Sequence, residues 1–328
     1  MQENFTCAPI LLIGFNRPDF MRAQIEAVRA AKPPRLYLSV DGPRQNRPGE
    51  AEKCRAVQEC ARLVDWPCEV RTLFQDKNLG CKYAPAKAID WFFKNEEIGI
   101  VLEDDCRPTA DFLRFATEML DRYGNDDRVG VISGYNMFGL QRDQSASYHF
   151  STDAKLSGGW ATWRRVWKDY DIEMGPYLGT LDETLRTLKA TPYFKRVFRS
   201  AVERVVNDGL DAWDVQFSLM IFATHRLGVV PRTQIVRNVG FDVAAATHTA
   251  GYNYYSKNWI HCGQLAFPLV YPQAVVCDEW ADRRREQMEG AIFPRGLTWL
   301  GCKVPRLAPF LSAVGGLVEK LAPILFRL

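Results

Sequence analysis

Short apolar runs alternate with amphipathic segments along the first hundred residues. The apolar runs predict strands at 9–15, 35–40, 68–74 and 98–102. Segments with helical spacing of apolar side chains lie between them, at 19–31, 51–63 and 83–93. Such alternation is typical of strand and helix units built around a parallel sheet. The pattern therefore predicts an α/β protein with a mainly parallel central sheet flanked by helices.

The second half of the chain continues with longer helical patterns and fewer strands. It predicts helices at 108–123 and 191–207, and a strongly apolar helix that begins at Asp214. Two glycines, Gly158 and Gly159, lead into a predicted helix that ends at Trp167 and carries three tryptophans. Further strands are predicted at 129–133, 148–151 and 229–239.

Each of the first four predicted strands is followed by polar residues. They are Arg17, Asp41 and Asp76, and then the acids Glu103, Asp104 and Asp105. In open parallel sheets, ligands bind beyond the carboxyl ends of the strands. Because each of these residues comes just after a strand, they predict one ligand-binding crevice along that edge of the sheet.

The three adjacent acids follow a wholly apolar run, IGIVL at 98–102. Neighbouring carboxylates repel one another unless a cation or hydrogen-bond donors compensate. Carboxylate oxygens suit a hard cation such as Mg²⁺ or Mn²⁺. A solvated acidic turn explains the same residues equally well, and the local pattern alone does not decide between them.

Three later segments offer candidate chemistry. Glycine at 158 and 159 permits close backbone approach to a ligand, although a tight turn explains it too. Asp214 at a helix start fits either a cap or a general base on a rigid element. The stretch 240–249, which contains Thr247 and His248, has the glycine, threonines and histidine of a loop that closes over phosphates.

Composition narrows the classes of function. The chain of 328 residues has a net charge of only +3 and no long basic run, which disfavours nucleic-acid binding. Neither G-x-G-x-x-G nor G-x-x-x-x-G-K follows the first strand, which disfavours dinucleotide dehydrogenases and P-loop enzymes. The nine cysteines form no C-x-x-C pair, which argues against a disulfide framework or a zinc cluster and fits a reducing cytosol.

The ends of the chain bear on localisation. The N-terminus lacks the regions of a signal peptide, so we expect a protein that is not secreted. The tail at 297–328 is apolar but is interrupted by prolines and charges, which disfavours a membrane span. It fits an amphipathic segment on a membrane surface, or docking on the globule or on a second subunit. The aromatic stretch 251–259 fits an acceptor wall or simple packing.

A series of short motifs resembles the glycosyltransferases of the GT-A fold. The series is FNRPD at 15–19, SVDGPR at 39–44, NLGCK at 78–82, EDD at 103–105, SGGWATW at 157–163, WD at 213–214, and NVGFD to ATHT at 238–249. It is similar to bacterial transferases related to N-acetylglucosaminyltransferase I and to family 2-like transferases. The similarity spans about residues 9–250.

The resemblance implies a Rossmann-like, mixed sheet with a nucleotide-sugar site at its end. It implies one domain at 1–250, with a nucleotide-binding half to about 130 and an acceptor-side half from 131, and a C-terminal extension at 251–328. It also implies a cytoplasmic enzyme, at the inner face of the cell membrane if the tail binds lipid.

The resemblance also assigns roles to residues. Arg17 and Asp41 would hold the nucleotide, Asp41 at the base, with Asp104 near the ribose. Asp105 would bind Mn²⁺ or Mg²⁺, with Asp104 and His248 as further ligands. Asp214 would be the general base, and Thr247 and His248 would contact the diphosphate. Pocket shape around Gly159, Trp160 and Trp213 would select the sugar.

The chain departs from some of these relatives in the region that would contact the nucleobase. Some relatives carry a nucleotide-contacting histidine in the helix after the third strand, where this chain has Ala86 and Lys87. Uridine is the leading expectation for the base.

The sequence therefore predicts a metal-dependent, inverting glycosyltransferase. It would move a sugar from a nucleoside diphosphate to a hydroxyl of a glycan or glycolipid, in bacterial cell-surface polysaccharide synthesis. Two alternatives remain open: a retaining transferase on the same fold, and a catalytically silent subunit that binds sugar nucleotide or glycan.

Overall fold

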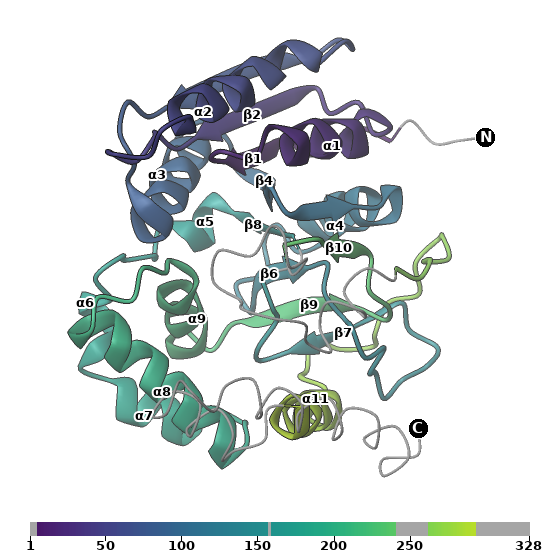
Figure 1. The fold of residues 1–328 in the computed structure, drawn as a ribbon. Helices are drawn as coiled ribbons and strands as arrows, with labels where there is room; N and C mark the ends of the chain where they lie inside the picture. Colours follow the sequence, from purple (N-terminus) through teal and green to yellow (C-terminus); the bar gives the residue numbers. More distant parts are fainter. Residues whose placement is uncertain (1–4, 157–158, 241–261, 293–328) are drawn as a thin grey trace.

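The computed structural model describes residues 5–156, 159–240 and 262–292. They form a central sheet of eight strands with helices on both faces (Figure 1). The strand order is β3-β2-β1-β4-β8-β6-β9-β7. The strands are β1 (Ile10–Gly14), β2 (Arg35–Val40), β3 (Glu69–Phe74), β4 (Ile98–Glu103), β6 (Val129–Ser133), β7 (Tyr148–Ser151), β8 (Trp160–Trp163) and β9 (Leu227–Pro231).

Most strands of this sheet run in one direction. β1 to β4 pair in parallel, and β6 pairs in parallel with β9. β8 lies antiparallel between β4 and β6, and β7 runs antiparallel to β9 at the edge. The predicted fold class, a mixed and mainly parallel sheet flanked by helices, is confirmed and is consistent with a Rossmann-like GT-A fold.

The helices cover the sheet because their apolar stripes face it. β1 is buried along its whole length, as expected of a strand with helices on both sides. The α-helices are α1 (Pro18–Arg29), α2 (Glu50–Glu59), α3 (Gly80–Asn95), α4 (Ala110–Arg122), α5 (Arg164–Trp167), α6 (Gly175–Leu178), α7 (Leu181–Thr187), α8 (Pro192–Asn207), α9 (Asp214–Ala223) and α11 (Glu279–Ile292); a 3-10 turn follows α2 at Cys60–Leu63.

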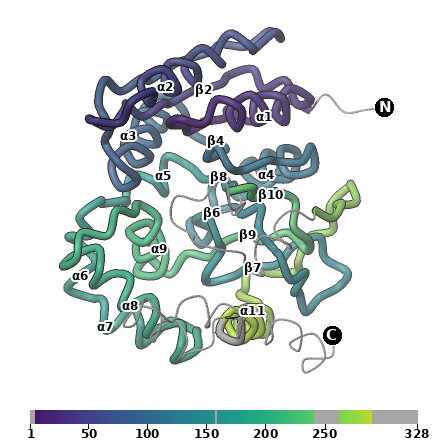
Figure 2. Tube along the Cα trace, in the orientation of Figure 1, coloured from purple at the N-terminus to yellow at the C-terminus, as the bar shows by residue number. Residues whose placement is uncertain are grey.

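The helices α6, α7, α8 and α9 form a separate group beside the sheet, at the lower left of Figure 2. Phe198 of α8 packs on Phe222 of α9 at 4.9 Å between ring centroids. Within the described ranges, no helix combines the length and the apolar character that crossing a bilayer requires.

Two predicted elements are wrong. Trp160–Trp163 is a strand, not the start of a helix, because it completes the ladder between β4 and β6. The predicted strand 229–239 is two strands: β9 belongs to the large sheet, whereas β10 (Val236–Asn238) pairs with β5 (Cys106–Pro108) in a second sheet. Neither β5 nor α11 was predicted.

The C-terminal part of the described chain returns to the body of the protein. The amide of Asp278 donates to the carbonyl of Phe150 at 2.7 Å, which brings α11 against β7. The domain boundary predicted at 250, the aromatic stretch 251–259 and the tail 297–328 lie outside the described residues.

Candidate active site

The acidic residues form a turn between two strands at the centre of the molecule. β4 ends at Glu103 and β5 begins at Cys106, so Asp104 and Asp105 occupy the turn between them. Glu103 pairs in register with Ile13 near the carboxyl end of β1. The turn therefore lies at the carboxyl edge of the parallel strands, where the sequence predicted a ligand crevice.

Arg17 immediately precedes α1, and its side chain reaches this turn. Its Nε donates to Oδ2 of Asp104 at 3.0 Å, and a terminal guanidinium nitrogen donates to the other oxygen of the same carboxylate. The guanidinium also lies 3.9 Å from Oδ2 of Asp105. The structure thus brings three predicted site residues together, with Asp104 buried and already paired.

Among the described residues, neither Glu103 nor Asp105 is held by two guanidinium hydrogen bonds as Asp104 is, and their negative charges repel one another. Burial, followed by the charges of Asp105, Asp214 and Asp104, raises the pKa of Glu103 to about 8. Burial and the charge of Asp104 raise the pKa of Asp105 to about 6, although Arg17 opposes this shift. Each shift reports an excess of negative charge in a poorly solvated place.

The second sheet holds the turn from its other side. The amide of Val239 donates to the carbonyl of Asp105 at 2.9 Å. Gly240 lies so close that a Cβ atom there would come within 2.2 Å of Oδ2 of Asp105. Gly240, the last described residue of this stretch, therefore lies beside Asp105.

Trp213 and Asp214 approach the turn from α9. The indole Nε1 of Trp213 donates to Oε1 of Glu103 at 3.2 Å, which anchors the start of the helix beside the acids. Asp214 is the first helical residue, and its Oδ1 accepts from the amide of Val215 at 3.1 Å. Its side chain is solvent-exposed, yet the surrounding protein atoms displace enough water to raise its pKa above the ordinary value.

Asp214 also lines a cavity of about 310 Å³ on the side of the sheet where α8 and α9 lie. The lining residues are Tyr135, Asp153, Ala154, Lys155, Leu156, Phe194, Phe198, Asp214, Val215, Ser218 and Glu289. Asp214 therefore lines the cavity and also lies near enough to the acidic turn for its charge to raise the pKa of Glu103.

Asp41 is placed differently from the acids of the turn. Its carboxylate accepts from the amides of Gly42 and Leu79, both at 2.9 Å, and from the side-chain amide of Asn78 at 2.8 Å. These bonds hold the loop that starts α3, and a ligand would have to compete with them. Its contact with a nucleobase stays a prediction.

Trp160 and Gly159 lie behind the site. Trp160 is 1% exposed and stacks on Trp213 at 5.4 Å between ring centroids. Gly159 has a φ of +77°, and a Cβ there would meet Leu102 at 2.8 Å. In this structure Trp160 supports Trp213 from within the core and Gly159 packs close to Leu102, and their direct contact with a donor stays a prediction.

The carboxylates of the acidic turn are the candidate ligands for a divalent cation. Asp105 offers a partly exposed carboxylate, with a side chain 21% exposed, whereas Asp104 is bound by Arg17. A single carboxylate with substrate phosphates and water suits Mg²⁺, and a cation would relieve the charge excess. Among the described residues, no group of three His, Cys, Asp or Glu side chains is arranged to hold a metal. The residues fit only a cation held jointly with a substrate.

Some residues could not be placed, and others were missed. Thr247 and His248 lie outside the described residues, as does the rest of the predicted phosphate loop after Gly240. Glu103 belongs to the acidic run, and the sequence assigns it no separate role. Its signal is its position as the last residue of a buried strand. Nothing in the sequence around Lys155 or Glu289 indicates that these residues line a cavity.

No protein-family model matches the chain, and no curated protein matches it significantly. Among solved structures, the chain is similar to a UDP-glucose pyrophosphorylase complexed with UDP-glucose, at 9% identity over 69% of this chain and 90% of that one, with a TM-score of 0.34. It is also similar to HddC from Yersinia pseudotuberculosis, at 10% identity over 50% and 80%, with a TM-score of 0.31. The glycosyltransferase GlyE of Streptococcus pneumoniae TIGR4 aligns at 14% identity over 68% of this chain and 45% of that chain, with a TM-score of 0.33. Likenesses this weak carry no argument about function, which must be argued from the site itself.

Proposed function

We propose that the protein is a metal-dependent, inverting glycosyltransferase that uses a nucleoside diphosphate sugar, with UDP as the leading candidate nucleotide. The acceptor would be a hydroxyl of a glycan or glycolipid. The observation that carries the proposal is the position of Asp214, between the acidic turn and a cavity large enough for a small molecule. A donor at the turn and an acceptor in the cavity would meet at this carboxylate.

The proposed reaction is a single displacement. The acceptor oxygen attacks the anomeric carbon, the bond from that carbon to the diphosphate oxygen breaks, and the hydroxyl proton passes to Asp214. The raised pKa of Asp214 makes it a stronger base than an ordinary aspartate. A rigid helix start, fixed by the bond from Trp213 to Glu103, keeps the carboxylate in place.

Charge at the leaving diphosphate would be offset on the other side of the site. A divalent cation at Asp105 would supply Lewis-acid stabilisation there. Arg17, 3.9 Å from Asp105, adds a fixed positive charge beside the same position. Its pairing with Asp104 holds the guanidinium in one orientation.

The test combines ligand-induced thermal stabilisation with a transfer assay. We expect Mn²⁺-dependent stabilisation by one nucleoside diphosphate, because a ligand that binds the native state raises its melting temperature. Asp105→Ala should abolish the Mn²⁺ dependence. Asp214→Asn should keep the stabilisation and lower transfer by about 100-fold or more, whereas Asp208→Asn, an exposed acid before α9, serves as the control.

Other outcomes would contradict the proposal in distinct ways. Retained transfer by Asp214→Asn would remove it as the base, and retention of the donor's anomeric configuration would identify a retaining enzyme. Nucleotide binding without turnover on any acceptor would indicate a silent binding subunit. Release of pyrophosphate from a nucleoside triphosphate with a sugar phosphate would identify a nucleotidyltransferase.

A further inference from the structure

The cavity beside Asp214 is built from five separate parts of the chain, one of which is Tyr135 in the segment between β6 and β7. The segment between β7 and β8 supplies Asp153 to Leu156, α8 supplies Phe194 and Phe198, α9 supplies Asp214 to Ser218, and α11 supplies Glu289. Its volume of about 310 Å³ lies at the lower end of the range of roughly 300–1,000 Å³ for small-molecule sites. The space suits one ring of a ligand and its linkage better than a long chain.

One wall of the cavity is aromatic. Phe194 and Phe198 lie one helical turn apart on α8, with ring planes only 10° from parallel and centroids 6.1 Å apart. Both side chains line the cavity and supply apolar surface there. The C–H face of a saccharide ring is a suitable partner for such a surface, because it is apolar while the hydroxyl groups point outward from the ring.

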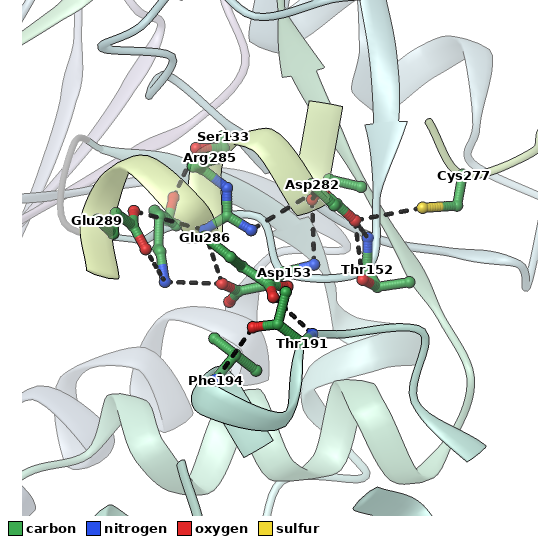
Figure 3. A network of polar contacts seen from close by, with 12 residues as sticks. Ser133, Thr152, Asp153, Thr191, Phe194, Cys277, Asp282, Arg285, Glu286 and Glu289 are labelled. Atoms are coloured by element: carbon green, nitrogen blue, oxygen red, sulfur yellow. Dashed lines mark hydrogen bonds and ion pairs between the residues drawn. The ribbon is translucent and has the colours of Figure 1, made fainter. Parts of the chain in front are cut away.

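A polar wall, fixed by ion pairs, adjoins the aromatic one, because Nζ of Lys155 lies 5.4 Å from the centroid of the Phe194 ring. Nζ of Lys155 lies 2.7 Å from Oδ2 of Asp153 and 3.9 Å from Oε2 of Glu289. Arg285 of α11 contacts both acids from behind, at 2.8 Å to Asp153 and 3.5 Å to Glu289 (Figure 3). The ion pairs hold these charged groups in place. The carboxylates can accept hydrogen bonds from ligand hydroxyls, and the ammonium of Lys155 can donate one.

The charge of the lining selects against one class of ligand. Asp153, Asp214 and Glu289 contribute carboxylates, and Lys155 is the cation among the lining residues. The ammonium of Lys155 is already paired with Asp153, and Arg285 lies behind the acids. An acidic ligand would therefore meet the negative charge of Asp214, which forms no salt bridge with another described residue, and like charges at close range are strongly unfavourable.

From this arrangement we infer that the cavity is the acceptor subsite, and that it takes a saccharide ring with hydroxyl groups and no acidic substituent. The inference rests on the proposed function, because it assigns the cavity to the acceptor of that reaction. Asp214 faces the ring, the phenylalanines cover one face of it, and the pairs of Lys155 with Asp153 and Glu289 bind its hydroxyls.

The test measures binding of two simple glycosides by saturation-transfer NMR. Methyl β-D-glucopyranoside is the neutral probe and its uronic acid counterpart, methyl β-D-glucuronide, is the anionic one. We expect the glucoside to bind, and the glucuronide to bind at least about tenfold more weakly. Glu289→Gln should narrow that difference because it removes one negative charge from the lining.

A cavity-filling variant locates the binding. Ser218→Leu places a larger side chain in the cavity one turn after Asp214, and should weaken glucoside binding at least about fivefold through steric exclusion. Ser200→Leu makes the same change on the exposed face of α8 and should bind normally. If Ser218→Leu fails to fold, Val215→Phe fills the same cavity from a neighbouring position.

The outcomes separate this inference from the proposed function. Absence of glucoside binding, glucoside binding unaffected by a folded cavity-filling variant, or preference for the glucuronide would each overturn the inference. Nucleotide-induced stabilisation could still be present in all three cases, and the proposed function would then stand. Glucoside binding lost in Ser218→Leu, with no response to any nucleotide, would support a sugar site and contradict the transferase.

Discussion

His149 is a buried titratable residue outside the acidic turn. It lies on β7 with 8% exposure, and its Nδ1 has no hydrogen-bond partner in the part of the chain that the structure describes. Burial lowers its pKa to about 4; the charges of Asp282 and Asp278 oppose this shift, and that of Arg285 adds to it. The folded protein therefore keeps this ring neutral at ordinary pH.

This burial predicts a pH-dependent loss of stability. The pKa of His149 is lower in the folded than in the unfolded chain, so its contribution is complete above about pH 6.5 and is lost as the pH falls towards 4. Glu103 and Asp105, whose pKa values are raised, act with the opposite sign as the pH falls. The comparison must therefore be made between variants. Between pH 7 and 5, the wild type should lose about 1–2 kcal/mol more unfolding free energy than His149→Gln.

Urea denaturation at the two pH values measures this difference directly. The absolute stability of His149→Gln does not matter, because only the change with pH is compared. Equal changes in the two proteins would mean that His149 titrates in the folded protein as it does in the unfolded chain.

At the scale of elements, the first turn of α3 connects the carboxyl edge of the sheet to the start of α9. Asp41 binds the residues just before the helix, and the carboxylate of Asp211 accepts from the amides of Cys81 and Lys82 at 2.9 and 2.5 Å. Gly80, with a φ of +80°, leaves room for Asp211, since a Cβ there would lie 2.8 Å from its Oδ2. Asp211 precedes the general-base candidate Asp214 by three residues, so this cap also positions the start of α9.

We expect Asp211→Ala to affect transfer more than stability. Loss of a helix cap costs about 1 kcal/mol of unfolding free energy, whereas a displaced Asp214 should lower transfer about tenfold or more. Nucleotide-induced stabilisation should change little. Asp208→Ala removes an exposed acid from the same connection and serves as the control. A loss of transfer no larger than the loss of folded protein would contradict the positioning role.

At the scale of the whole molecule, α11 joins parts of the chain that lie far apart in sequence. Asp282 accepts from the amide and the hydroxyl of Thr152, both at 2.8 Å, and Arg285 binds Asp153 (Figure 3). The amide of Thr191 donates to Glu286 at 2.6 Å, which ties the same helix to the start of α8. The polar wall of the cavity therefore exists only when α11 is in place.

Arg285→Met should be strongly destabilising for this reason. It leaves Asp153 and Asp282 as buried acids with less compensation, and removing one partner of a buried ion pair costs about 3–5 kcal/mol. Arg283→Met changes an exposed arginine of the same helix and should cost little. Chemical denaturation of both variants checks this, and similar midpoints would show that the Arg285 network does not stabilise the fold.

Local patterns in the sequence were enough to predict the strands β1, β2 and β4, the helices between them, and the meeting of Arg17 with the acids of the turn. These features depend on hydrophobic periodicity and on the rule that parallel strands end at a common edge, and both can be read within a few residues. The start of α9 at Asp214 was predicted for the same reason.

The tertiary structure decided what depends on partners distant in the chain. Trp160–Trp163 is a strand because β4 and β6 lie on either side of it, and β10 leaves the large sheet because β5 offers a second ladder. Distant partners also decide three features of the candidate site. The loop before α3 binds Asp41, neighbouring charges raise the pKa of Glu103, and α11 brings Glu289 to Lys155 at the cavity. Burial of charge and strand pairing are non-local, so no local periodicity in the sequence encodes them.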